Sequence, residues 1–80
     1  MSMNVRALKE LRRKAGLTQE NLAHLAGIST SLLAKIEIGR GNPTALTIRK
    51  IAQGLSKSLG LPVNTILIQL MAESEEAPHA

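Results

Sequence analysis

Hydrophobic residues recur along this chain at steps of three and four, and turn-forming residues separate the runs. This spacing is typical of a helix with one buried face, whereas no run alternates strictly between apolar and polar residues as a half-buried strand does. The pattern therefore predicts five helices, at about 4–15, 19–26, 30–38, 45–59 and 63–72. The expected fold class is all-α.

The predicted helices begin and end at residues suited to those positions. Ser29 precedes the third helix, and its hydroxyl oxygen can accept a hydrogen bond from an unpaired amide of the first turn. Only Gly27, Ile28 and Ser29 join the second and third helices, a spacing found in the helix-turn-helix motif. Short helix pairs of this kind also serve purely structural roles, so the spacing alone does not establish DNA binding.

Composition and charge narrow the possible partners. The chain has 80 residues without Cys, Phe, Tyr or Trp, which predicts one small aliphatic core without disulfides or thiolate metal sites. Residues 1–72 hold all ten basic residues and three of the six acidic ones, and residues 73–80 form a predicted acidic, disordered tail. A basic domain suits a polyanion such as nucleic acid, although a basic surface that serves only solubility has the same charge.

A longer pattern resembles a known family. From Val5 to Leu67 the chain resembles the lambda-repressor-like helix-turn-helix family, also called the Cro/C1 or XRE family. The resemblance is carried by the runs LKELRRKAGLTQENLAHLAGIS, KIEIGRGNPT and TIRKIAQGL. It implies a five-helix DNA-binding domain in which helices 2 and 3 form the helix-turn-helix, with the third helix in the major groove.

The third predicted helix is expected to read DNA bases. By their spacing, Leu33 and Ile36 face the core, which leaves the opposite side of the helix for the groove. Hydroxyl groups on that side can donate or accept at base edges, the amine can reach guanine, and a leucine can contact a thymine methyl. The predicted base-reading residues are Thr30, Ser31, Leu32, Ala34 and Lys35. The alternative for Thr30 and Ser31 is that they only suit a first helical turn.

Other residues are expected to hold the DNA backbone or the fold. The predicted backbone contacts are Gln19, Ser29, Gly39, Arg40 and Asn42, including the loop amides from Gly39 to Asn42. For Gln19 the resemblance implies a contact with a phosphate and a role in holding the recognition helix in place. It also implies a structural ion pair between Arg12 and Glu37. Ile38 departs from the family, which usually has a polar or basic residue there, and we expect it to be exposed.

The last predicted helix has more apolar residues than one buried face needs. Because a contiguous exposed apolar patch usually marks an interface, we expect a homodimer. The predicted interface residues are Ile66, Leu67, Leu70 and Met71. A two-fold dimer matches a pseudo-palindromic operator. The competing expectation is that this helix folds against the core of its own chain and leaves a monomer.

Other classes of function find little support in the sequence. His24 stands alone and His79 lies in the predicted tail, so we expect no enzyme, metal site or cofactor. No apolar run is long enough to span a membrane and no signal peptide is visible, so we expect a cytoplasmic protein without a membrane partner.

The leading hypothesis is a transcriptional regulator that binds double-stranded DNA and acts as a dimeric repressor. A protein-interaction module is the main alternative, such as an antitoxin whose apolar last helix binds a partner protein. A coactivator that bridges proteins is the third. The sequence does not identify the operator, the regulated genes or the sign of regulation.

Overall fold

The computed structural model describes residues 3–73, and this part of the chain forms five α-helices and no strand. In chain order they are α1 (Val5–Lys14), α2 (Gln19–Ala26), α3 (Thr30–Glu37), α4 (Ala45–Leu59) and α5 (Val63–Met71). Every predicted helix is present, and no end differs from its predicted position by more than one residue. The all-α fold class is therefore confirmed. Beyond Glu73, the predicted acidic tail lies outside the described residues.

Hydroxyl side chains cap three of the helices, and among them is the predicted cap Ser29. Thr18, Ser29 and Thr44 accept hydrogen bonds of 3.0 to 3.1 Å from the amides of Asn21, Leu32 and Thr47. Each bond satisfies an amide that has no carbonyl partner within its own helix. Gly27 ends α2 with a φ of 71°, a left-handed conformation that allows the chain to turn into α3 within three residues.

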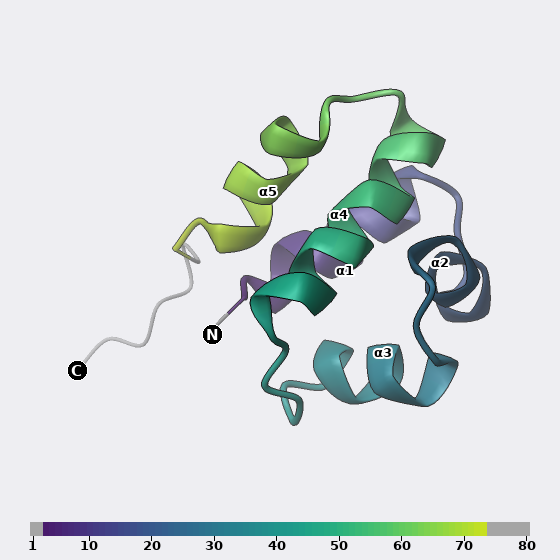
Figure 1. The fold of residues 1–80 in the computed structure, drawn as a ribbon, viewed down its shortest axis with the longest axis vertical. Coiled ribbons are helices and arrows are strands. Elements are labelled where there is room, and N and C mark those ends of the chain that lie inside the picture. The colour runs from purple at the N-terminus through teal and green to yellow at the C-terminus, as the bar shows by residue number, and fades with distance from the viewer. Residues whose placement is uncertain (1–2, 74–80) are drawn as a thin grey trace.

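The core is aliphatic and is organised around α4. Figure 1 shows α4 through the middle of the molecule, with α2 on one side, α5 on the other and α3 along the lower edge. The most completely buried large side chains come from all five helices, namely Leu8, Leu22, Leu33, Ile36, Ile51, Leu55, Ile66 and Leu70. On α4, a Cβ at Gly54 would lie 3.2 Å from the backbone nitrogen of Ala26, so glycine permits the close approach of α2.

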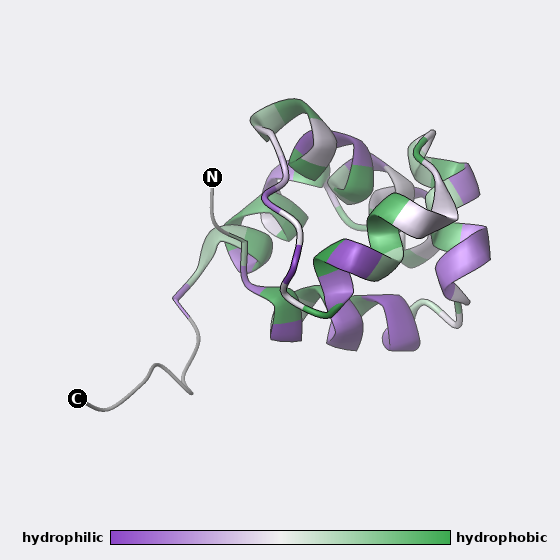
Figure 2. Ribbon diagram, turned by 90° about the horizontal axis from the view of Figure 1, so that it is seen from below, coloured by the Kyte–Doolittle hydropathy of each residue, from purple (hydrophilic) through white to green (hydrophobic). Residues whose placement is uncertain are grey.

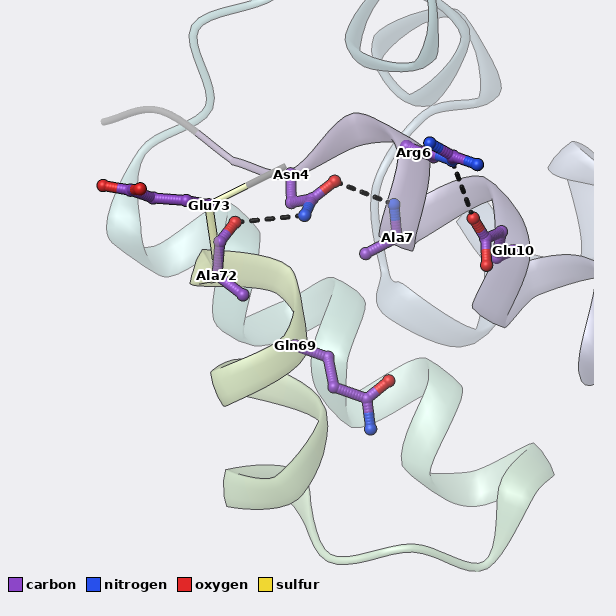
Figure 3. A pocket seen from close by; sticks show the side chains of 7 residues that line it. All are labelled: Asn4, Arg6, Ala7, Glu10, Gln69, Ala72 and Glu73. Carbon is purple, nitrogen blue, oxygen red and sulfur yellow. Dashed lines mark hydrogen bonds and ion pairs between the residues drawn. The ribbon is translucent and has the colours of Figure 1, made fainter. Parts of the chain in front are cut away.

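Asn4 joins the start of α1 to the end of α5. Its side-chain oxygen accepts a hydrogen bond of 3.0 Å from the amide of Ala7, which caps α1. Its side-chain nitrogen donates to the carbonyl of Ala72 at 3.0 Å, and its backbone amide donates to the carbonyl of Leu70. Figure 3 shows this arrangement beside a polar hollow between the two helices. One residue therefore satisfies backbone groups at the ends of two helices.

Candidate nucleic-acid interface

The recognition surface is built on two helices of eight residues each, α2 and α3. Leu33 and Ile36 hold the inner side of α3 against the core and are 0% and 1% exposed. Of the five predicted base-reading residues, Ala34 is partly buried and the others are exposed, namely Thr30, Ser31, Leu32 and Lys35. These side chains are therefore brought together on one side of a helix at the edge of the fold. Figure 2 views the molecule from that side and shows both hydrophilic and hydrophobic residues on it.

The N-terminus of α3 offers donors for an anion. The hydroxyl oxygen of Ser29 accepts from the amide of Leu32 at 3.0 Å, which leaves the proton of that hydroxyl group available for donation. The first amides of any α-helix also lack carbonyl partners within the helix, and the helix dipole favours negative charge at this end. A DNA phosphate matches this environment.

Glu37 fixes the C-terminal end of α3 to the rest of the domain. The residue is only 3% exposed, and the predicted ion pair with Arg12 is present. The guanidinium group donates from Nε to Oε2 at 2.7 Å and from Nη2 to Oε1 at 3.1 Å. Its Nη1 donates to the carbonyl of Leu17 at 3.0 Å. The pair therefore connects α1, the turn that follows it and α3.

Gln19 joins Arg12 and Glu37 in one partly buried cluster, here called the Glu37 cluster. Its Nε2 donates to Oε1 of Glu37 at 2.9 Å, which agrees with the role in holding the recognition helix that the family resemblance implied for Gln19. Glu37 follows Leu33 by four positions and therefore shares the buried side of α3. A buried carboxylate needs several donors. The second proton on Nε2 is still able to donate to a phosphate.

The hydrogen bonds of the loop after α3 contradict part of the predicted contacts with the DNA backbone. The amide of Gly39 donates to the carbonyl of Ile36 at 3.0 Å, and those of Arg40 and Gly41 donate to the carbonyl of Lys35 at 3.0 and 3.2 Å. These amides satisfy the last carbonyls of α3, so they are not available to a phosphate. The predicted contact through the amide of Gly39 is therefore wrong. The exposed side chain of Arg40 remains accessible.

Comparison with known proteins decides what this arrangement is. Residues 8–62 match the family model described as helix-turn-helix, a range that includes α2, the turn and α3. The chain belongs to the Cro/C1-type helix-turn-helix family. Its members are DNA-binding transcriptional regulators, and this helix-turn-helix protein is one of them.

The helix-turn-helix protein is similar to several curated transcriptional regulators. It is 37% identical over 68 residues to the regulator y4dJ of Sinorhizobium fredii, covering 85% of this chain and 78% of that protein. It is 41% identical over 49 residues to SutR of Escherichia coli, covering 61% of this chain and 28% of SutR. It is 50% identical over 46 residues to RghRB of Bacillus subtilis, covering 56% of this chain and 33% of RghRB. The last two matches span a third or less of each relative.

A second surface of the helix-turn-helix protein lies on α5, and it differs from the predicted interface. Ile66 and Leu70 are 0% exposed because they pack into the core of their own chain, so they offer no surface to a partner. Their place in the predicted interface is therefore corrected. Ile68 is 71% exposed and Met71 is 43% exposed, while Leu67 is partly buried. The apolar residues of this helix are therefore divided between the core and the surface.

Residues 3–73 of the helix-turn-helix protein lack the features of two other kinds of site. Within residues 3–73, no three side chains of His, Asp or Glu gather closely enough to hold a metal ion. None of the helices described has the length and apolar character needed to cross a membrane. Ile38 is 67% exposed, as the family comparison of its position predicted.

Proposed function

We propose that this protein binds a pseudo-palindromic operator in double-stranded DNA as a homodimer and represses transcription there. The observation that carries the proposal is the arrangement of α3. Its inner side is anchored by Leu33, Ile36 and the Glu37 cluster, and its outer side is exposed. A helix held rigidly with one free side is suited to enter the major groove.

In this proposal different groups position the protein and read the sequence. The base-reading residues are Thr30, Ser31, Leu32, Ala34 and Lys35, which occupy the outer side of α3. Phosphates are held by the side chains of Gln19, Ser29, Arg40 and Asn42 and by the N-terminus of α3. Contacts with phosphates supply affinity and register, whereas contacts with base edges supply specificity.

The proposed dimer uses the exposed apolar side chains at and before α5. Leu61, Ile68 and Met71 are 38%, 71% and 43% exposed, and Leu67 is partly buried beside them in the sequence. A small domain gains stability when it covers such side chains with a second copy. A two-fold dimer of this kind presents two recognition helices about 34 Å apart, which is one turn of DNA. Occupying a promoter site in this way excludes other proteins, which gives repression.

The same surface favours one alternative function. Ile68 and Met71 can also bind a different protein, as in an antitoxin that holds a partner through its last helix. In that case the purified chain is a monomer, and a partner protein covers α5. The two functions therefore predict different oligomeric states for the purified chain.

Selection of duplexes from a random library, followed by sedimentation, tests the proposal. Wild-type protein should enrich a pseudo-palindrome and sediment as a dimer. Lys35→Ala should bind the enriched duplex at least about fivefold more weakly with little change on random DNA, because a base contact contributes about 1–3 kcal/mol. Lys57→Ala is the matched control, since it removes an exposed lysine on α4 outside the recognition helix. Failure to enrich any sequence contradicts the proposed function.

A further inference from the structure

The outer side of α3 has an unusual chemical make-up for a helix that reads bases. Arg, Lys, Asn and Gln make the contacts that identify guanine or adenine, and within Thr30–Glu37, all of which the structure describes, Lys35 alone is of these types. Glu37 is buried in its cluster with Arg12 and Gln19. Lys35 is therefore the one long polar side chain that this helix exposes.

The remaining polar groups discriminate weakly between bases. The hydroxyl groups of Thr30 and Ser31 can each donate or accept, so they suit more than one base edge. Lys35 has rotatable donors on a flexible stem, and it can reach either guanine or a phosphate. Strong preference for one base at every position cannot come from these three side chains alone.

Leu32 is the large apolar side chain on this surface, and its place is well fixed. It is 36% exposed in the first turn of α3, where recognition helices of this motif contact base edges. Its backbone amide donates to the hydroxyl oxygen of Ser29 at 3.0 Å. The next residue, Leu33, is 0% exposed in the core. Both contacts hold the backbone of Leu32 rigidly against the domain.

We propose that Leu32 determines specificity by recognising the 5-methyl group of a pyrimidine, which is thymine in unmodified DNA. The methyl group of thymine is the apolar group that a base edge presents in the major groove. This inference rests on the proposed function, in which the outer side of α3 enters that groove. Each half-site then contains a thymine opposite Leu32 whose methyl group is covered in the complex.

The first experiment removes the methyl group from the DNA without changing base pairing. A duplex enriched from a random library by the whole wild-type chain is prepared with each thymine replaced in turn by uracil. Binding should weaken about fourfold at the thymine opposite Leu32, because burying one such carbon contributes ~0.8 kcal/mol. Replacement of thymines elsewhere in the duplex should change the affinity by much less.

Two variants assign the methyl preference to a side chain. Leu32→Ala should bind the thymine and uracil duplexes with nearly equal affinity, since the side chain that covers the methyl group is gone. Leu46→Ala is the matched control because Leu46 is an exposed leucine on α4, 61% accessible and outside the recognition helix. This control should keep the fourfold difference of the wild type.

A second pair of duplexes restores the methyl group on a different base. At the sensitive position, the thymine–adenine pair is replaced by cytosine–guanine or by 5-methylcytosine–guanine, which differ from each other only in that methyl group. Wild type should bind the methylated duplex about fourfold more tightly than the unmethylated one. Leu32→Ala should bind both equally.

The outcomes separate this inference from the proposed function. If a duplex is enriched but no uracil replacement weakens wild-type binding, the inference is overturned and sequence-specific binding stands. It is also overturned if Leu32→Ala keeps the difference between thymine and uracil. If no duplex is enriched at all, the proposed function fails and the inference fails with it. A wild-type chain that shows no uracil effect overturns the inference even if a variant does not fold.

Discussion

Arg12 and Glu37 lie 25 residues apart and form two hydrogen bonds through Nε and Nη2 of the guanidinium group, at 2.7 and 3.1 Å. The pair joins the first helix to the end of the recognition helix. Glu37 also accepts from Gln19, so one buried carboxylate is bound by donors from two other helices. The orientation of α3 therefore depends on a polar contact as well as on the aliphatic core.

Removing this carboxylate should be costly. Glu37→Ala is expected to lower the free energy of unfolding by about 3 kcal/mol, because it leaves the guanidinium group of Arg12 largely buried without its charged partner. Urea denaturation measures the change. Glu10→Ala is the matched control, since it breaks an exposed ion pair with Arg6, and it should cost less than about 0.5 kcal/mol. Equal costs for the two variants would contradict the structural role of Glu37.

Arg40 should position the protein on DNA without reading bases. Arg40→Ala is expected to weaken binding to an enriched duplex and to random DNA by similar factors, because phosphates are alike in both. The slope of log affinity against log salt should fall by about one, corresponding to one phosphate contact. Filter binding at several salt concentrations measures both quantities. A changed sequence preference in this variant would assign Arg40 to base reading instead.

Asn4 should stabilise two helices through separate groups. Asn4→Asp keeps an oxygen for the amide of Ala7 but loses the donor to the carbonyl of Ala72, and should cost about 1 kcal/mol. Asn4→Ala loses both and should cost about 1 kcal/mol more. Hydrogen exchange separates the effects, because the Ala7 amide should exchange faster in Asn4→Ala than in Asn4→Asp. Identical exchange in the two variants would show that the side chain does not cap α1.

Charges placed on α5 should distinguish its surface from its core. Ile68→Glu is expected to change the free energy of unfolding by less than about 0.5 kcal/mol, since the side chain is exposed, while it abolishes the proposed dimer. Leu70→Glu should lower stability by more than about 3 kcal/mol, because it puts a charge into the core. Sedimentation and circular dichroism measure the two effects. A dimer that persists in Ile68→Glu would remove α5 from the interface.

The helices were predictable because local signals mark both their spacing and their ends. The hydroxyl caps and Gly27 act on neighbouring backbone groups, so their effect is visible in a few consecutive residues. The division of the apolar residues of α5 between core and surface could not be predicted from such local signals. Ile66 and Leu70 are spaced for one side of a helix, but Ile68 and Met71 are equally apolar, and packing against α4 and α1 decides which side is covered.

The candidate site was likewise predictable only where local residue spacing determines it. Exposure of Ser31 and Lys35 follows from the spacing of Leu33 and Ile36, which the sequence displays. The contact between Gln19 and Glu37 joins two helices, and the loop amides of residues 39–41 turn back to α3. Both depend on the path of the chain in space, which residue spacing does not specify.

The contact made by Asn4 brings residues separated by 68 positions into hydrogen-bonding distance, so the two ends of the described chain lie close together. When the two ends lie close together, the same packing of helices can be built by a chain that starts at a different connection. Joining the two ends by a short linker and opening the chain in the exposed connection between α4 and α5 would therefore keep every helix whole. The order of the helices in such a permuted chain would begin with α5, and the turn between α2 and α3 would remain intact.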